Sequence, residues 1–194
     1  MKKQFFLAMV LLLSSVVTFA QQEEGTFTLQ PRAGVNISKL PNQATGGADD
    51  KVRIGLAAGL EGEYQLTSKF SLSAGLMYSQ QGMKLEAEDE KITMKLDYLN
   101  IPILAQYYVS KGFAVKAGIQ PGFNLSHKAG GETIKNVNSF DFSIPIGLSY
   151  EFPSVPVVID ARYNWGLTDV AKENQGDKIW NEVIQITIGY KFKL

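Results

Sequence analysis

The chain has 194 residues, with 19 basic and 19 acidic side chains, one histidine and no cysteine. A balanced net charge excludes a protein that binds nucleic acid through bulk positive charge. The lack of cysteine excludes disulfides, a thiolate nucleophile and a cysteine zinc site, and one histidine cannot build a multi-histidine metal site. We therefore expect no cofactor and no nucleic-acid partner.

The first 20 residues have the pattern of a secretory signal peptide. Two lysines precede the apolar run Phe5–Val17, and Thr18–Ala20 ends it with small residues at its first and last positions, before the predicted cleavage point after Ala20. The run is short for the ~20 residues of a membrane-spanning helix. We predict an exported protein with a signal peptide (residues 1–20) and one mature domain (residues 21–194).

The mature chain alternates between apolar and polar residues. In its last segment Ile184, Ile186 and Ile188 take one set of alternate positions, and Gln185 and Thr187 take the other. Successive side chains of a strand point to opposite faces, so this pattern predicts a strand with one apolar face. Eight segments follow it: Phe27–Ile37, Val52–Leu66, Phe70–Gln80, Leu99–Val109, Phe113–Leu125, Phe140–Phe152, Val157–Leu167 and Ile184–Leu194. Each is long enough for a tilted membrane crossing of ~9–11 residues.

The connections between these segments alternate in length. The short ones are Thr67–Lys69, Ser110–Gly112 and Pro153–Pro156, and the long ones are Ser38–Lys51, Gln81–Lys91, Ser126–Ser139 and Thr168–Val183. Short turns at one end and long loops at the other are typical of outer-membrane barrels. We therefore predict an all-β fold, an eight-stranded antiparallel up-and-down transmembrane β-barrel with both termini on the periplasmic side.

One segment changes phase. From Ile92 to Tyr98 the apolar residues take even positions, whereas from Leu99 to Val109 they take odd positions. Either a β-bulge or an extension of the strand beyond the membrane explains the change.

Alternation does not separate a membrane barrel from a soluble lipocalin-like barrel, which turns its apolar face inward. Glycines such as Gly34, Gly75 and Gly147 recur on the polar face, where a narrow interior needs room for long charged side chains. Aromatic residues gather near both strand ends, as in the two girdles at membrane interfaces. Both features favour the membrane barrel. The predicted membrane-interface aromatics are Tyr64, Phe70, Tyr78, Tyr107, Phe113, Phe142, Tyr150, Phe152, Trp165, Trp180, Tyr190 and Phe192.

Charged residues of the polar face form the main candidate site. The interior of an eight-stranded barrel is just wide enough for side chains to fill, and nearly balanced charges suit mutual pairing. We predict an ionic network in the lumen made by Arg32, Arg53, Glu61, Glu63, Lys116, Asp141, Glu151, Asp160, Arg162 and Lys191. A path for a solute is the alternative interpretation.

The segment Tyr98–Leu104 (YLNIPIL) resembles the Y-L-x-I-P-hydrophobic signature of the small porin-family outer-membrane β-barrels of Gram-negative bacteria. The segments Ala117–Gly122, Ala161–Leu167 and Ile188–Phe192 are similar to the later strands of that family. The resemblance implies an outer-membrane location and supplies no catalytic residues. The chain departs from the family in continuing to Lys193 and Leu194 after the expected terminal aromatic.

A catalytic site is not evident in the sequence. Ser126 and His127 are adjacent, and adjacent strand or loop residues point apart, so they do not form a nucleophile–base pair by themselves. Acidic residues of the long loops, such as Asp49 and Glu88, lack the spacing of a calcium loop. We expect a solvated histidine, solvated loop carboxylates and no metal.

We predict a non-enzymatic outer-membrane protein with a structural or interaction role through four extracellular loops. Its partners are expected to be outer-membrane lipid and lipopolysaccharide, with an extracellular ligand or protein at the long loops, and we expect a monomer. The alternative is a small porin or solute channel. An envelope-lipid-modifying enzyme ranks third.

Overall fold

The computed structural model describes residues 23–41, 49–87, 90–172 and 178–194, so the predicted signal peptide lies outside the described part. The strands are β1 (Phe27–Lys39), β2 (Asp49–Thr67), β3 (Phe70–Ala87), β4 (Glu90–Asn100), β5 (Ile103–Ser110), β6 (Phe113–Ala129), β7 (Glu132–Thr133), β8 (Phe140–Glu151), β9 (Val157–Gly166), β10 (Glu182–Tyr190) and β11 (Phe192–Lys193). Among the described residues, no helix is long and apolar enough to cross a membrane.

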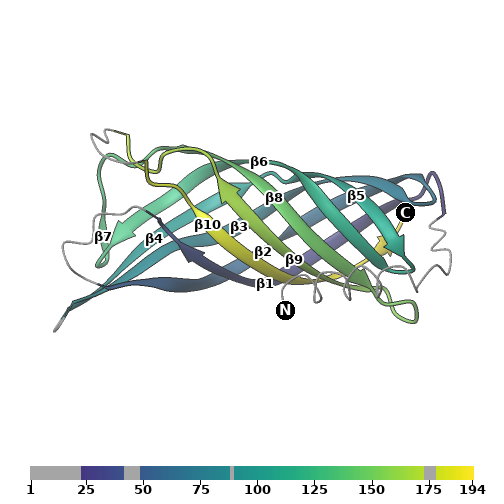
Figure 1. The fold of residues 1–194 in the computed structure, drawn as a ribbon, viewed down its shortest axis with the longest axis horizontal. Helices are drawn as coiled ribbons and strands as arrows, with labels where there is room; N and C mark the ends of the chain where they lie inside the picture. Colours follow the sequence, from purple (N-terminus) through teal and green to yellow (C-terminus); the bar gives the residue numbers. More distant parts are fainter. Residues whose placement is uncertain (1–22, 42–48, 88–89, 173–177) are drawn as a thin grey trace, which may run out of the picture.

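The strands form one closed antiparallel barrel (Figure 1). Neighbours in the wall follow chain order, and β1 pairs with β10 to close the ring. Strands β4 and β5 share one wall position, because both pair with β3 on one side and with β6 on the other. Strands β7 and β11 only lengthen the pairing of β6 and β1. The ring therefore has the eight wall positions that the sequence predicts.

The two ends of the barrel differ, and we name them by their connections. The turn end carries the tight β2–β3 and β5–β6 hairpins and the C-terminus, whereas the loop end carries β7 and the loop-side half of β4 (Figure 1). The described termini meet at the turn end, where the Leu194 amide donates to the Phe27 carbonyl.

The barrel is apolar outside and polar inside over most of its length. On β10, Ile184, Ile186 and Ile188 are 46%, 43% and 56% exposed, while Gln185 and Thr187 are 2% and 3% exposed. A water-soluble barrel has the reverse arrangement, and an apolar surface of this extent is stable only against an apolar medium. The lipocalin-like alternative is therefore wrong, and the outer surface faces lipid.

The phase change before Leu99 comes from an extension of the wall at the loop end. Leu96 and Tyr98 are buried inside the barrel, and the same inward phase continues through Asn100 and Leu104. The outward-facing Lys95 is exposed. The extension thus has a polar outside and an apolar inside, as expected for a part of the wall that water surrounds. For β4, the extension is therefore the correct explanation. The β4–β6 pairing does have a register shift between Asp97 and Tyr98, but it does not change which residues of β4 face inward.

An apolar cluster fills the interior of this extension. Its buried members are Leu40, Met83, Leu96, Tyr98 and Val170, from β3, β4 and the chain beside β1 and β9. Next to Met83, the β2–β3 pairing has a register shift at Gly82, whose φ of 120° favours glycine. A Cβ atom there would lie 2.1 Å from the Met94 carbonyl oxygen. The loop end therefore has its own small hydrophobic core, which the sequence analysis does not predict.

Candidate functional site in the barrel lumen

A layer of five charged side chains crosses the lumen. Arg162 donates from Nη2 to Glu61 Oε2 and from Nε to Asp160 Oδ1, both at 2.5 Å. Lys116 Nζ lies 2.6 Å from Asp160 Oδ2, and Arg32 Nη1 lies 2.8 Å from Glu61 Oε1. These side chains are at most 3% exposed. We call these five residues the ionic layer; they come from β1, β2, β6 and β9.

Glycines on the facing strands make room for the two arginines. Gly147 lies opposite Arg162 in the β8–β9 ladder, and a Cβ atom there would lie 3.0 Å from the Arg162 Cγ. Gly189 lies opposite Arg32, and a Cβ atom there would lie 3.1 Å from the Arg32 Cγ. This close approach explains why glycine recurs on the inward face of a narrow barrel.

A second charged group lies towards the turn end. Lys191 Nζ pairs with Glu151 at 2.8 Å and with Glu63 at 3.1 Å. Glu63 also accepts hydrogen bonds from Tyr108 at 2.6 Å and Ser71 at 2.7 Å. The ionic layer has three cations and two anions, and this group has one cation and two anions, so the charges balance at four each. Balanced pairing offsets the cost of taking charges out of water.

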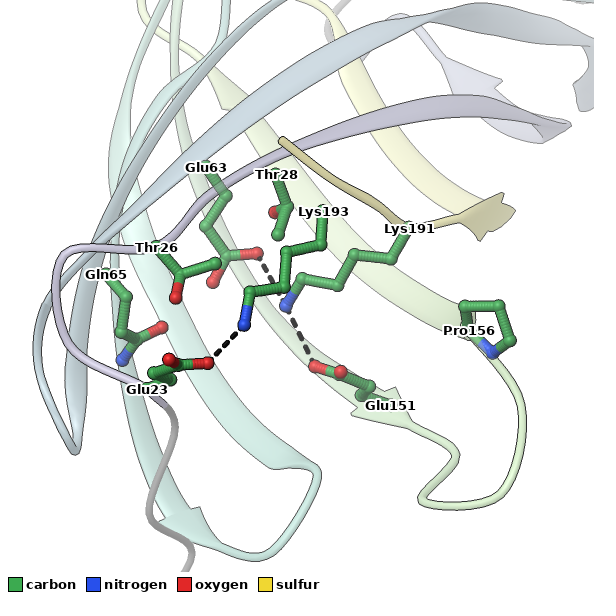
Figure 2. A pocket seen from close by; sticks show the side chains of 9 residues that line it. All are labelled: Glu23, Thr26, Thr28, Glu63, Gln65, Glu151, Pro156, Lys191 and Lys193. Atoms are coloured by element: carbon green, nitrogen blue, oxygen red, sulfur yellow. Dashed lines mark hydrogen bonds and ion pairs between the residues drawn. The ribbon is translucent and has the colours of Figure 1, made fainter.

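The turn-side group forms the floor of a pocket with a volume of about 240 Å³ (Figure 2). Figure 2 shows Glu63 and Glu151 on either side of Lys191, and Lys193 reaching Glu23 nearer the surface. The Lys193 ammonium, hydrogen-bonded to Glu23, holds the pKa of that exposed carboxyl below its usual range. The pocket therefore presents charges that already pair with one another.

Two residues of the predicted network lie outside both groups. Arg53 Nη2 lies 3.8 Å from Asp97 Oδ1. The predicted network does not include Asp97, because this residue lies in the segment of β4 where the alternation changes phase. Asp141 accepts a hydrogen bond from Thr168 Oγ1 at 2.5 Å and pairs with no cation among the described residues. The single predicted network is thus two charged groups and one separate pair, and Asp141 belongs to none of them.

The structure brings most of the predicted interface aromatics to the outer surface near the strand ends. The exposed ones are Tyr64, Tyr107, Tyr150, Phe152, Trp165, Tyr190 and Phe192, and the half-buried ones are Phe70, Tyr78, Phe113 and Phe142. Trp180 lies in the connection before β10, where its Nε1 donates to Glu182 at 3.3 Å, and so is not on the barrel wall. The predicted set omits Phe140, which packs edge-to-face on Phe123 at 5.7 Å; both rings are 46% exposed.

The structure places His127 against an amide side chain. The ring Nδ1 of His127 lies 2.8 Å from Asn124 Oδ1, so the recorded contact of the histidine is to an amide and not to Ser126. In the part of the chain that the structure describes, no three His, Cys, Asp or Glu residues come together as metal ligands.

These features define an eight-stranded membrane β-barrel whose lumen is filled by paired charges. A family model described as "Outer membrane protein beta-barrel domain" matches residues 19–172, and the chain belongs to that family of outer-membrane proteins. Among curated protein sequences, none matches this chain.

Solved structures share the barrel at low sequence identity. The attachment invasion locus protein Ail of Yersinia pestis, in complex with the heparin analogue sucrose octasulfate, is 14% identical, with a TM-score of 0.54 over 87% of this chain and 99% of that one. Neisserial surface protein A is 16% identical, with a TM-score of 0.53 over 87% of this chain and 100% of that one. At these identities the likeness shows the fold.

Proposed function

We propose that this protein is a non-enzymatic integral outer-membrane protein that acts through its loop end outside the cell and does not conduct solutes. In this proposal the turn end, with both termini, faces the periplasm, and the protein is a monomer. An extracellular ligand or protein meets the long loops.

The ionic layer is the observation that carries the closed lumen. Its five side chains contact one another across a barrel whose interior is about as wide as the side chains that fill it. The apolar cluster at the loop end adds a second filled level, because Leu96 and Tyr98 leave little polar surface along which an ion could pass. The ionic layer and the apolar cluster lie one after the other along the lumen, and together they support a lumen closed by side chains and not an open pore.

The differing ends of the barrel support the orientation. Outer-membrane barrels have short turns on the periplasmic side and longer loops outside. In this chain the wall also extends past its apolar band at the loop end, where Lys84, Lys95 and Lys128 face outward and are exposed. A rigid, water-facing extension is suited to hold loops above a membrane surface, and this supports an interaction role there.

Planar-bilayer recording of the folded protein tests the closed lumen. We expect no steady single-channel conductance under conditions in which a known porin gives regular steps. A stable ohmic current that changes its ion selectivity when Asp160 is replaced would overturn the proposal and favour the small-porin alternative. In a second arm, the mass spectrum of lipid A from cells with and without the protein should be the same, and a new lipid species would contradict the non-enzymatic role.

A further inference from the structure

Three exposed lysines lie side by side on the outer surface of the loop end. Lys95 of β4 and Lys128 of β6 are direct partners in the ladder. Lys84 of β3 pairs with Thr93, two residues from Lys95 and on the same face. Directly opposed residues in a sheet have Cβ atoms ~4.5–5.5 Å apart, and diagonal neighbours are ~7–8 Å apart. We call these three residues the lysine row.

The lysine row has no ion-pair partner among the described residues. Two described carboxylates on the same strands are already engaged: Glu86 pairs with Lys51, and Asp97 accepts from Tyr78 at 3.0 Å and lies 3.8 Å from Arg53. Like charges directly opposed in a ladder destabilise the sheet. Neighbouring cations on one face without internal neutralisation therefore favour an anionic partner from outside the chain.

The position of the lysine row relative to lipid identifies the kind of partner. On β4, Lys95 lies four residues beyond the outward Leu99, and on β6, Lys128 lies three residues beyond Leu125, which is 58% exposed on the lipid-facing surface. At ~3.3 Å per residue the row begins about 10–13 Å along the strands from the apolar band. The strands of such barrels are tilted by ~35–45°, so the row lies about 7–11 Å along the membrane normal from the apolar band. The headgroup region of each leaflet is ~5–7.5 Å thick, which places the row at its outer edge, where long lysine side chains can reach the headgroups.

We propose that the lysine row binds the phosphate groups of a phosphorylated glycolipid headgroup in the outer leaflet. Lysine ammonium groups form charge-assisted hydrogen bonds to phosphate oxygens, and three ammonium groups on adjacent strands match a headgroup with more than one phosphate. The lysines at the loop-side ends of β1 and β2 differ from this row, because Lys39 pairs with Glu182 and Lys51 pairs with Glu86. The inference rests on the proposed orientation, and it names the lipid class that the loop end contacts.

Native mass spectrometry of the folded protein in detergent micelles tests the site. The probes are lipid A with two phosphates, lipid A with one phosphate, phosphatidylglycerol and inorganic phosphate. The variant K84Q/K95Q/K128Q is compared with K135Q/K172Q/K178Q, which removes the same charge from loop-end positions outside the lysine row. We expect lipid A with two phosphates to bind best, with weaker binding as salt rises, and to bind the lysine-row variant about tenfold more weakly or worse. The control variant should bind as the wild-type protein does.

Equal loss of binding in both triple variants, or no loss in the lysine-row variant, would overturn the site. Full competition by millimolar inorganic phosphate would assign the site to free phosphate and overturn the lipid partner, as would equal binding of phosphatidylglycerol. Heat-modifiable gel mobility reports folding, and single K→Q variants replace the triple variant if it does not fold. A protein that binds the lipid yet conducts ions would contradict the proposed function alone, whereas a closed protein that does not bind it would contradict this inference alone.

Discussion

At the residue scale, the carboxylates of the ionic layer are each shared by more than one cation. Glu61 contacts Arg32 and Arg162, and Asp160 contacts Lys116 and Arg162, all with fully buried or nearly buried side chains. The layer already has three cations for two anions. Loss of a carboxylate therefore leaves more uncompensated buried charge than loss of a cation does.

The substitution Glu61→Gln tests this charge balance. Glutamine keeps the shape of the side chain, but it leaves Arg32, Lys116 and Arg162 with one carboxylate among them. We expect a loss of about 3–5 kcal/mol in the free energy of unfolding, measured by urea unfolding in lipid vesicles.

The control is Glu132→Gln, in which an exposed carboxylate of β7 changes in the same way. This variant should unfold at the same urea concentration as the wild-type protein, because exposed charges contribute little to stability. If Glu61→Gln were as stable as Glu132→Gln, the ionic layer would be hydrated and not a buried network.

At the element scale, the outer face of the wall meets two environments. Within the apolar band, β8 turns Ile146 outward with 56% exposure and keeps Ser149 inside. In the extension, β4 turns Lys95 outward and keeps Leu96 inside. The same alternation of side chains thus serves lipid on one part of the wall and water on the other.

The substitution Ile146→Arg places a cation on the lipid-facing side in the middle of β8. We expect it to cost about 2–4 kcal/mol, as for a cation near the bilayer midplane. The matched control is Val155→Arg, an exposed apolar residue in the β8–β9 turn, where the cost should be about 0–1 kcal/mol. Equal unfolding free energies of the two variants in lipid vesicles would show that β8 does not present Ile146 to lipid.

The substitution Leu96→Ala tests the separate core of the loop end. Removing a fully buried leucine side chain should cost about 2–5 kcal/mol of local stability, whereas Leu125→Ala, on the lipid-facing surface, leaves no internal cavity and should cost less. Hydrogen exchange should rise in the loop-side halves of β3 and β4 and stay unchanged in β9 and β10. A uniform rise over all strands, or none in β4, would contradict an independent core there.

The sequence predicts the strands and their faces because a period of two is visible within each segment. Ile184–Tyr190 illustrates this, since its apolar positions are the outward ones in the structure. Partners across the lumen depend on the stagger between strands, which no single segment encodes. For this reason the pairing of Arg53 with Asp97 and the separate position of Asp141 could not be predicted. The phase change at Tyr98 was a signal of the apolar cluster. Alternation alone did not show whether this phase change came from a β-bulge or from an extension of the wall.

At the scale of the whole molecule, the barrel has three zones along its axis. The turn end holds the pocket and the Lys191 group, the middle holds the ionic layer, and the loop end holds the apolar cluster. The lipid-facing surface surrounds the first two zones, and the polar extension surrounds the third. The interior is filled by paired and apolar side chains, and the wall extends beyond the apolar band at the loop end; contacts outside the cell are therefore the proposed activity.

The most direct test of this lipid-embedded, side-chain-filled barrel is a spin-label scan along β10. The chain has no cysteine, so single cysteines at successive positions from Ile184 to Gly189 carry the only labels. In lipid vesicles, labels at Ile184, Ile186 and Ile188 should be accessible to oxygen and shielded from a water-soluble nickel reagent. Labels at Gln185 and Thr187 should be immobilised and shielded from both. Loss of this alternation, or access of the nickel reagent to the inward positions, would contradict the closed barrel in lipid.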